Sequence, residues 1–322
     1  VLKGGSNPYD RLNMYEAGPI HQKWTDPHPF GQWTFGAGAW TDDTRYRILV
    51  YRAILEKGRR VTSKEFAEYL EHRVQRSKEQ PEDSLERRWM TDMFKFSVIA
   101  DIANSPIPFA SVFEIITGWG GPAGILHPFN PFEAARDGGV TAAAVAEAMK
   151  PNATVDSIIE AARDSFWTIP GSYSKEGIGF LQNEYVKRID KAIDKARKTK
   201  DMKKFIESFY EDSLVTYSPW NLLYPLEIIP VALGMFYINE GDYKQTVIGC
   251  VNFGRDNETI AAIAGEIAGA YQGIDAVPAE WIDKVKAENS EDLEDIAIQM
   301  YNLVIKRKNE LEQQVDYFRS LE

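Results

Sequence analysis

The sequence predicts an all-α protein that folds as a single compact multi-helix domain. Two observations predict the helices: apolar residues recur at helical spacing from residue 41 almost to the C-terminus, and capping residues stand where several of these stretches begin. No stretch shows the sustained alternation of a strand. The 322 residues can bury a substantial core, and no Gly-, Ser- or Pro-rich linker divides them. The predicted domain therefore spans residues 1–322.

Residues 1–40 form the first segment and show neither a helical nor an alternating period. They are rich in glycine and proline, which favours loops. They also hold aromatic residues, including Trp24, Phe30 and Trp33, which a disordered tail would rarely carry. We expect an ordered aromatic and proline-rich loop region that lines a cleft.

Three helices are predicted next. The first begins near Thr41 and ends near Gly58, and the second opens at Thr62, which forms a capping box with Glu65. The third spans residues 84–103 as one continuous helix with an apolar side.

Prolines and glycines interrupt the pattern between residues 105 and 131, and helices are predicted from there on. Their expected ranges are 132–149, 155–166 with Thr154 as the cap, 177–198, 202–210, 225–239, 243–251, 259–272, 281–287 and 293–321. Residues 290–322 hold the C-terminal helix, whose apolar stripe could pack on the core or form a dimer contact. Core packing is the favoured interpretation.

Composition excludes several classes of function. A formal net charge of −11 and a pI of about 5.1 disfavour binding to nucleic acids and to anionic membrane surfaces. The sequence has no apolar run of membrane-spanning length and no signal-peptide pattern at its start, so we expect a soluble, cytoplasmic protein. The single cysteine, Cys250, lies in an apolar run and is expected to be a buried, inert thiol.

Two polar clusters carry the candidate chemistry, and each stands where a loop enters a predicted helix. Their members are Thr41, Asp42 and Asp43 in the first cluster and Asp256, Glu258 and Thr259 in the second. Either cluster alone could serve as a helix cap. Four carboxylates in one cleft would raise each other's pKa values unless cations balanced them. Together the clusters indicate two divalent cations, Mg²⁺ or Mn²⁺, and metal-assisted hydrolysis.

The two clusters and their surroundings resemble the signature motifs of the ADP-ribosylglycohydrolase family, which includes the dinitrogenase reductase-activating glycohydrolases. The resemblance rests on Thr-Asp-Asp-Thr at residues 41–44 and on the segment from Gly254 to Gly265, and it spans roughly Gly18 to Trp281. It implies an all-α fold of that type with a dinuclear Mg²⁺ or Mn²⁺ site. It also implies hydrolysis at the anomeric carbon of ADP-ribose attached to a protein side chain or a small molecule.

The resemblance assigns roles to the acids. Thr41, Asp42, Asp43, Asp256 and Thr259 match metal-ligand positions, and Glu258 matches one where the family usually has Asp. Asp42, Asp43, Asp256 and Glu258 are the candidate catalytic residues, since one of the four acids would orient the attacking water. Whether Glu258 is a ligand or the base stays open.

Other positions bear on the substrate. Arg255 stands where many members have glycine, and its guanidinium could pair with a substrate phosphate or with a neighbouring acid. Trp119, Gly120 and Gly121 are further candidate substrate contacts in a glycine-rich turn. The family's N-terminal acidic helix has no clear counterpart, so either the chain starts after it or Glu16 replaces its acid.

The expected partner is an ADP-ribosylated protein or an ADP-ribosyl small molecule. Two alternatives stand beside this function: hydrolysis of another N- or O-riboside, and a non-catalytic binding or structural role.

Overall fold

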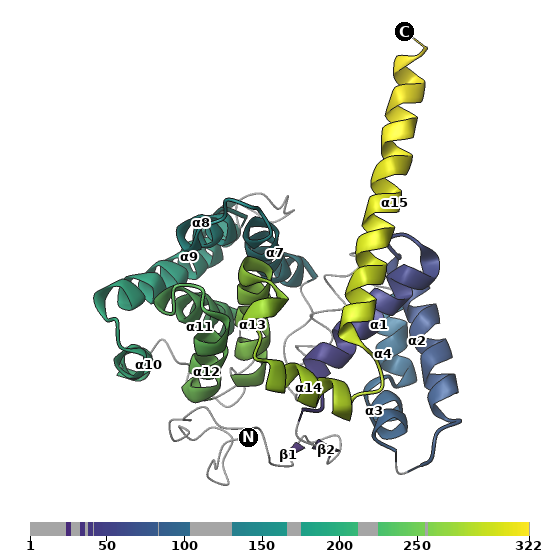
Figure 1. Cartoon of the computed structure of the whole chain (residues 1–322), viewed down its shortest axis with the longest axis horizontal. Helices are drawn as coiled ribbons and strands as arrows, with labels where there is room; N and C mark the ends of the chain where they lie inside the picture. The colour runs from purple at the N-terminus through teal and green to yellow at the C-terminus, as the bar shows by residue number, and fades with distance from the viewer. Residues whose placement is uncertain are drawn as a thin grey trace. The chain divides into compact units, whose positions relative to one another are not determined.

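The computed structural model confirms the predicted all-α class (Figure 1). It describes residues 24–26, 33–35, 38–40, 42–82, 84–103, 131–165, 175–211, 225–254 and 257–321. Contacts divide the chain into two compact units, one of residues 1–24 and 110–284 and the other of residues 25–109 and 285–322. The expected single domain stays a prediction. Among the described residues, no helix is long and apolar enough to cross a membrane.

The unit of residues 25–109 and 285–322 is built around a small aromatic core. Its helices are α1 (Asp42–Lys57), α2 (Ser63–Ser77), α3 (Leu85–Met93), α4 (Phe96–Ala103) and α15 (Leu293–Arg319). Tyr46 of α1 packs against Trp89 at 5.0 Å and Phe94 at 5.9 Å between ring centroids, and all three rings are buried. This cluster fixes α1 against α3.

The predicted capping box at the start of α2 is confirmed. The backbone N–H of Glu65 donates to Thr62 Oγ1 at 3.2 Å, and the Thr62 N–H donates to Glu65 Oε2 at 2.9 Å. The Arg59 guanidinium donates to the same carboxylate and lowers the pKa of Glu65 to about 2, with the Thr62 N–H assisting. The local signal in the sequence therefore located this helix start correctly.

The prediction of one continuous helix over residues 84–103 is wrong. It consists of α3 and α4, which are separated at Phe94 and Lys95. Phe94 leaves the helical conformation with φ −106° and ψ 62°, and its ring packs edge-on against Trp89. Packing in the aromatic core therefore interrupts the helix at Phe94, although the helical spacing of apolar residues continues past it.

Two short strands were not predicted. β1 (Trp24–Asp26) pairs with β2 (Trp33–Phe35) in a two-stranded sheet, and β2 lies beside α3. Segments of three residues are too short to show an alternating period, so no strand signal is visible in the sequence.

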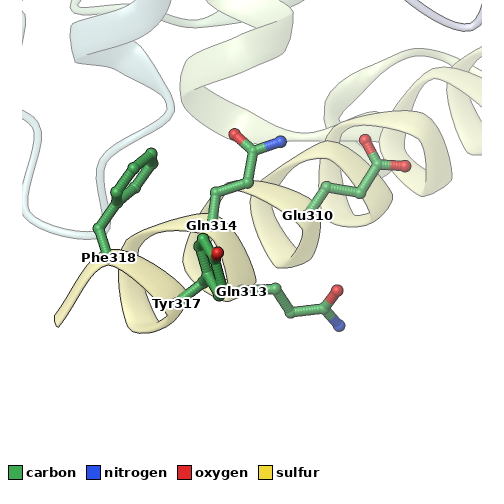
Figure 2. A pocket seen from close by; sticks show the side chains of 5 residues that line it. All are labelled: Glu310, Gln313, Gln314, Tyr317 and Phe318. Atoms are coloured by element: carbon green, nitrogen blue, oxygen red, sulfur yellow. The ribbon is translucent and has the colours of Figure 1, made fainter. Parts of the chain in front are cut away.

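Helix α15 packs on its own unit along its first part alone. Ile296 is buried and Leu303 is half-buried, whereas Val304, Leu311 and Val315 are exposed. Figure 2 shows Glu310, Gln313, Gln314, Tyr317 and Phe318 around a shallow hollow on the last turns of the helix. The prediction that the apolar stripe of the C-terminal helix packs on the core is therefore wrong beyond Leu303.

The unit of residues 1–24 and 110–284 is a helical bundle. Its helices are α7 (Pro131–Ala148), α8 (Val155–Ser165), α9 (Lys175–Lys198), α10 (Met202–Glu211), α11 (Pro225–Ile238), α12 (Tyr243–Phe253), α13 (Asn257–Gln272) and the short 3₁₀ helix η2 (Ile274–Ala276). Helix α14 (Ala279–Glu288) follows and spans the boundary of the units. Thr154 caps α8 as predicted, accepting from the Ser157 N–H at 3.0 Å.

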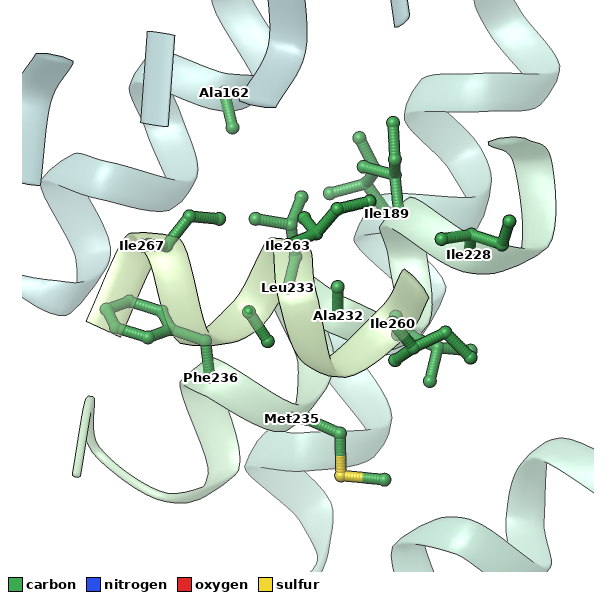
Figure 3. Close-up of a cluster of buried hydrophobic side chains, with 14 of the residues drawn as sticks. Ala162, Ile189, Ile228, Ala232, Leu233, Met235, Phe236, Ile260, Ile263 and Ile267 are labelled. Carbon is green, nitrogen blue, oxygen red and sulfur yellow. The ribbon is translucent and has the colours of Figure 1, made fainter. Parts of the chain in front are cut away.

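Helix α11 is the centre of this bundle. Every residue from 226 to 236 is buried, and all of them except Glu227 are apolar or glycine, as expected for a central helix. It packs against α8, α9, α12 and α13. Figure 3 shows side chains of α11, such as Leu233 and Phe236, among those of α8, α9 and α13, such as Ala162, Ile189 and Ile263. This core holds α12 and α13, and with them the second polar cluster.

Candidate functional site

The segment that leads into the first acid pair is anchored by the side chain of Asn289. Asn289 Oδ1 accepts from the Trp40 N–H at 3.0 Å, while its Nδ2 donates to Gly38 O at 2.8 Å and to Val285 O at 2.7 Å. Gly38 has a φ of +90°, which glycine tolerates and other residues rarely adopt. The amide therefore fixes the chain just before Asp42. Sequence reasoning missed Asn289, because nothing local marks a contact across 249 positions.

Arg45, in the first turn of α1, fixes the same segment from the other side. Its Nε donates to Trp40 O at 3.0 Å, and its guanidinium carbon lies 5.7 Å from the centre of the Trp89 ring. Its Nη1 also lies 3.5 Å from Glu86 Oε2. The backbone of α1 therefore starts at Asp42 in a defined place, with the acid pair in its first turn.

The turn before the second cluster is closed by hydrogen bonds to the last carbonyls of α12. Tyr210 Oη donates to Phe253 O at 2.6 Å, and Asn257 Nδ2 donates to Val251 O at 3.0 Å. Gly254 follows with a φ of +80° and is buried. These contacts lie where α12 ends at Phe253 and where α13 begins at Asn257, on the two sides of Arg255 and Asp256 in the sequence.

Glu258 and Thr259 lie in the first turn of α13, and both are partly exposed. A helix N-terminus carries a partial positive charge, which stabilises a carboxylate there. The face of α13 that carries Gly265 and Gly269 packs closely on α12. A Cβ built on Gly265 would lie 3.3 Å from Val247 Cγ2, and one on Gly269 would lie 3.7 Å from the Tyr243 ring. Close packing of the two helices makes the start of α13 a rigid platform.

Several predicted site residues fall outside the described part of the chain. They are Thr41, Arg255, Asp256, Trp119, Gly120 and Gly121, together with Glu16 and the side chains of Asp42 and Asp43. The first acid pair belongs to the unit of residues 25–109 and 285–322, and Glu258 and Thr259 belong to the other. Among the described residues, no three His, Cys, Asp or Glu side chains are grouped for metal binding. Since most of the candidate ligands lie outside that part, the metal site stays a prediction.

Cys250 is fully buried in the core of its unit, as predicted. Burial raises the pKa of its thiol above the ordinary value, so the reactive thiolate is disfavoured. A groove elsewhere in this unit is lined by residues of α8 and α9, including Asp156, Arg163 and Asp190. It contains none of the predicted site residues.

Curated relatives match short parts of the chain. The chain is 31% identical over 108 residues to the ADP-ribosylhydrolase ARH3 of Xenopus tropicalis, which covers 34% of this chain and 28% of the relative. It is 33% identical over 103 residues to ADP-ribosylhydrolase ARH3 of Gallus gallus, covering 29% and 28%. An uncharacterized protein of Archaeoglobus fulgidus is 35% identical over 83 residues, 26% of each chain. Each alignment thus spans less than a third of the relative's length.

The family comparison covers more of the chain. The family model described as ADP-ribosylglycohydrolase matches residues 131–310, more than half of the 322 residues. The match includes the second polar cluster with its anchoring turn and helix α13, and it ends within α15. The chain therefore belongs to the ADP-ribosylglycohydrolase family.

Proposed function

We propose that this chain is a glycosidase that releases ADP-ribose from a modified protein side chain or a small molecule. The observation that carries the proposal is the family match, which contains the segment Gly254–Gly265 at the start of α13. The names of the relatives from Xenopus and Gallus, ADP-ribosylhydrolase ARH3, support the ADP-ribosyl substrate class. They do not support the dinitrogenase reductase-activating subtype, which stays a prediction.

The residues at the two helix starts fit a pair of divalent cations. Carboxylates and threonine hydroxyls are hard oxygen donors, the kind that Mg²⁺ and Mn²⁺ prefer. We propose Thr41, Asp42, Asp43, Asp256, Glu258 and Thr259 as the ligands. Bound cations would neutralise the acids and polarise the hydroxyls of the ribose. Both segments are held by side-chain hydrogen bonds, from Asn289 in one case and from Tyr210 in the other, which is how ligands are usually kept in orientation.

The acids also supply the proton transfers that the reaction needs. In the proposed reaction one carboxylate accepts a proton from the attacking water, whose oxygen forms a bond to the anomeric carbon. The bond from that carbon to the leaving group breaks, and the leaving group takes up the proton that the water has lost, so that one water is consumed and the acids return to their starting state. Glu258 is the alternative candidate for this base: in that role its side chain, longer than the Asp that the family usually has there, would act on the water instead of binding a cation.

The test is release of ADP-ribose from ADP-ribosylated arginine, ADP-ribosylated serine and O-acetyl-ADP-ribose, with Mg²⁺, with Mn²⁺ and with a chelator. The variant Asp256→Ala is compared with Asp156→Asn, a matched control whose exposed acid lies in the first turn of α8. We expect cation-dependent turnover that Asp256→Ala reduces by at least about 100-fold, as for loss of a metal-site residue, and that Asp156→Asn retains. Turnover that is equal in the two variants would contradict the assigned site.

A second candidate substrate class is another N- or O-riboside. Arg255 motivates it, because a guanidinium at a position where many members have glycine changes the charge that a substrate meets. No turnover of the three ADP-ribosyl substrates, combined with cation-induced stabilisation of the folded chain, would favour this class. No turnover and no cation effect on stability would favour a non-catalytic role.

A further inference from the structure

Helix α15 carries an exposed apolar stripe beyond the part that packs on its own unit. Val304, Leu311, Val315 and Phe318 lie along one side of the helix, with exposed fractions of 59%, 56%, 46% and 67%. Their spacing of seven, four and three residues keeps them within a narrow sector of the helix surface. Leaving such a stripe in water is unfavourable, and isolated exposed residues would not repeat at this spacing.

The stripe has the alternating three and four residue spacing of a coiled-coil seam. Counting from Tyr301, the seam positions are Tyr301, Val304, Lys308, Leu311, Val315 and Phe318. Five of the six are apolar or aromatic. Lys308 is the polar exception, and a single polar residue in a seam typically selects one arrangement of the helices over the others.

We propose that this stripe pairs with the same stripe of a second copy of the chain, with the two helices antiparallel. A stripe on one helix can meet its own copy around a two-fold axis, so no other protein is needed. The antiparallel register places Tyr301 against Phe318 of the second copy and Val304 against Val315 of the second copy. Lys308 then faces Leu311 of the second copy instead of another lysine.

Charge favours this arrangement over the parallel one. A parallel pair would place the two Lys308 side chains in the same layer, where like charges repel. In the antiparallel pair, Glu312 of the second copy lies beside that layer and can take up the charge of Lys308. Within one helix Lys308 Nζ is 3.5 Å from Glu312 Oε1 and both side chains are more than 60% exposed, so this contact contributes little and is easily exchanged.

The area available sets the expected strength of the dimer. An aromatic side chain covers about 150–250 Å² when fully buried, and Tyr301 and Phe318 each expose about two thirds of theirs. With the three aliphatic residues, the stripe offers roughly 400–500 Å² per copy, near the lower boundary for a specific interface. We therefore infer a reversible dimer whose population depends on protein concentration.

The first experiment measures the molar mass of the full chain by sedimentation equilibrium from low to high concentration. Leu311→Glu places a charge in the seam, and the matched control Asn309→Glu places the same charge on the exposed opposite side of α15. We expect the wild type and Asn309→Glu to form dimers. The dissociation constant of the Leu311→Glu dimer should be at least about tenfold higher than that of the wild type. A wild type that is monomeric throughout, or a Leu311→Glu variant that dimerises equally well, would overturn the proposal.

A second experiment tests the direction of the helices by disulfide cross-linking. Mixing Val304→Cys with Val315→Cys should give a cross-linked heterodimer, because these positions face each other in the antiparallel register. The native Cys250 is buried and does not interfere. Efficient cross-linking of Val315→Cys alone would overturn the antiparallel arrangement. Circular dichroism of each variant checks that the fold is kept, which is expected since the altered side chains are largely exposed.

Discussion

Asn289 is the residue on which the approach to the first acid pair depends. One amide group satisfies three backbone groups, of Gly38, Trp40 and Val285, and the side chain is partly buried. Removing this side chain leaves the Trp40 N–H and the Gly38 carbonyl without that partner, which water can replace only in part. The Val285 carbonyl keeps its bond from the Asn289 backbone N–H.

We predict that Asn289→Ala lowers the free energy of unfolding by about 1–3 kcal/mol, the cost of losing hydrogen bonds of this kind. It should also weaken the stabilisation of the chain by Mg²⁺ or Mn²⁺, since the segment before Asp42 is no longer held. Urea unfolding with and without the cation measures both effects. Asn302→Ala, which alters an exposed asparagine in α15, is the control and should change neither quantity. Equal behaviour of the two variants would contradict the anchoring role.

At the scale of elements, the packing of α13 on α12 distinguishes two glycines of the same helix face. A Cβ at Gly269 would lie 3.7 Å from the Tyr243 ring, an ordinary contact, whereas one at Gly265 would lie 3.3 Å from Val247 Cγ2. Alanine is better than glycine within a helix by about 0.5–1 kcal/mol. This gain in stability should be seen in Gly269→Ala. In Gly265→Ala it should be offset, because Val247 must move to make room for the added methyl group.

The resulting prediction is that Gly269→Ala raises the melting temperature, while Gly265→Ala leaves it unchanged or lowers it. For a chain of 322 residues, about 1 kcal/mol corresponds to roughly 1–2 °C. Thermal unfolding followed by circular dichroism measures both variants side by side. The reverse order would show that α12 and α13 are not packed at the distances described.

The same elements show what the sequence could predict. Helix starts were found where the signal is local, as at Thr62 and Thr154, whose side chains cap the backbone three residues ahead. The break at Phe94 was missed because its ring also packs against Tyr46, which lies in another helix, α1. The role of Asn289 was missed for the same reason. Helix caps can be predicted from neighbouring residues in the sequence, whereas contacts between residues far apart in the sequence cannot.

At the scale of the whole molecule, the family match and the first acid cluster cover different parts of the chain. The match begins at residue 131, so Asp42 and Asp43 lie before it, whereas Glu258 and Thr259 lie within it. The sequence identified both clusters from their residue types and their order along the chain. It could not show the anchoring of either cluster, which depends on hydrogen bonds from Asn289 and Tyr210 to segments distant in sequence.

The part of α15 that its own unit does not bury is available for the assembly of the molecule. Deleting residues 308–322 removes no buried side chain, because the described residues 308–321 are all exposed except the half-buried Glu310. At concentrations where the chain is monomeric, we expect the same melting temperature with and without the deletion. As concentration rises, the wild type should melt at progressively higher temperature, because association stabilises the folded state by mass action. The deletion variant should not. Calorimetry over a concentration series distinguishes these cases: a lower melting temperature at high dilution would mean that the segment stabilises its own chain, and a parallel rise in both proteins would place the dimer contact elsewhere.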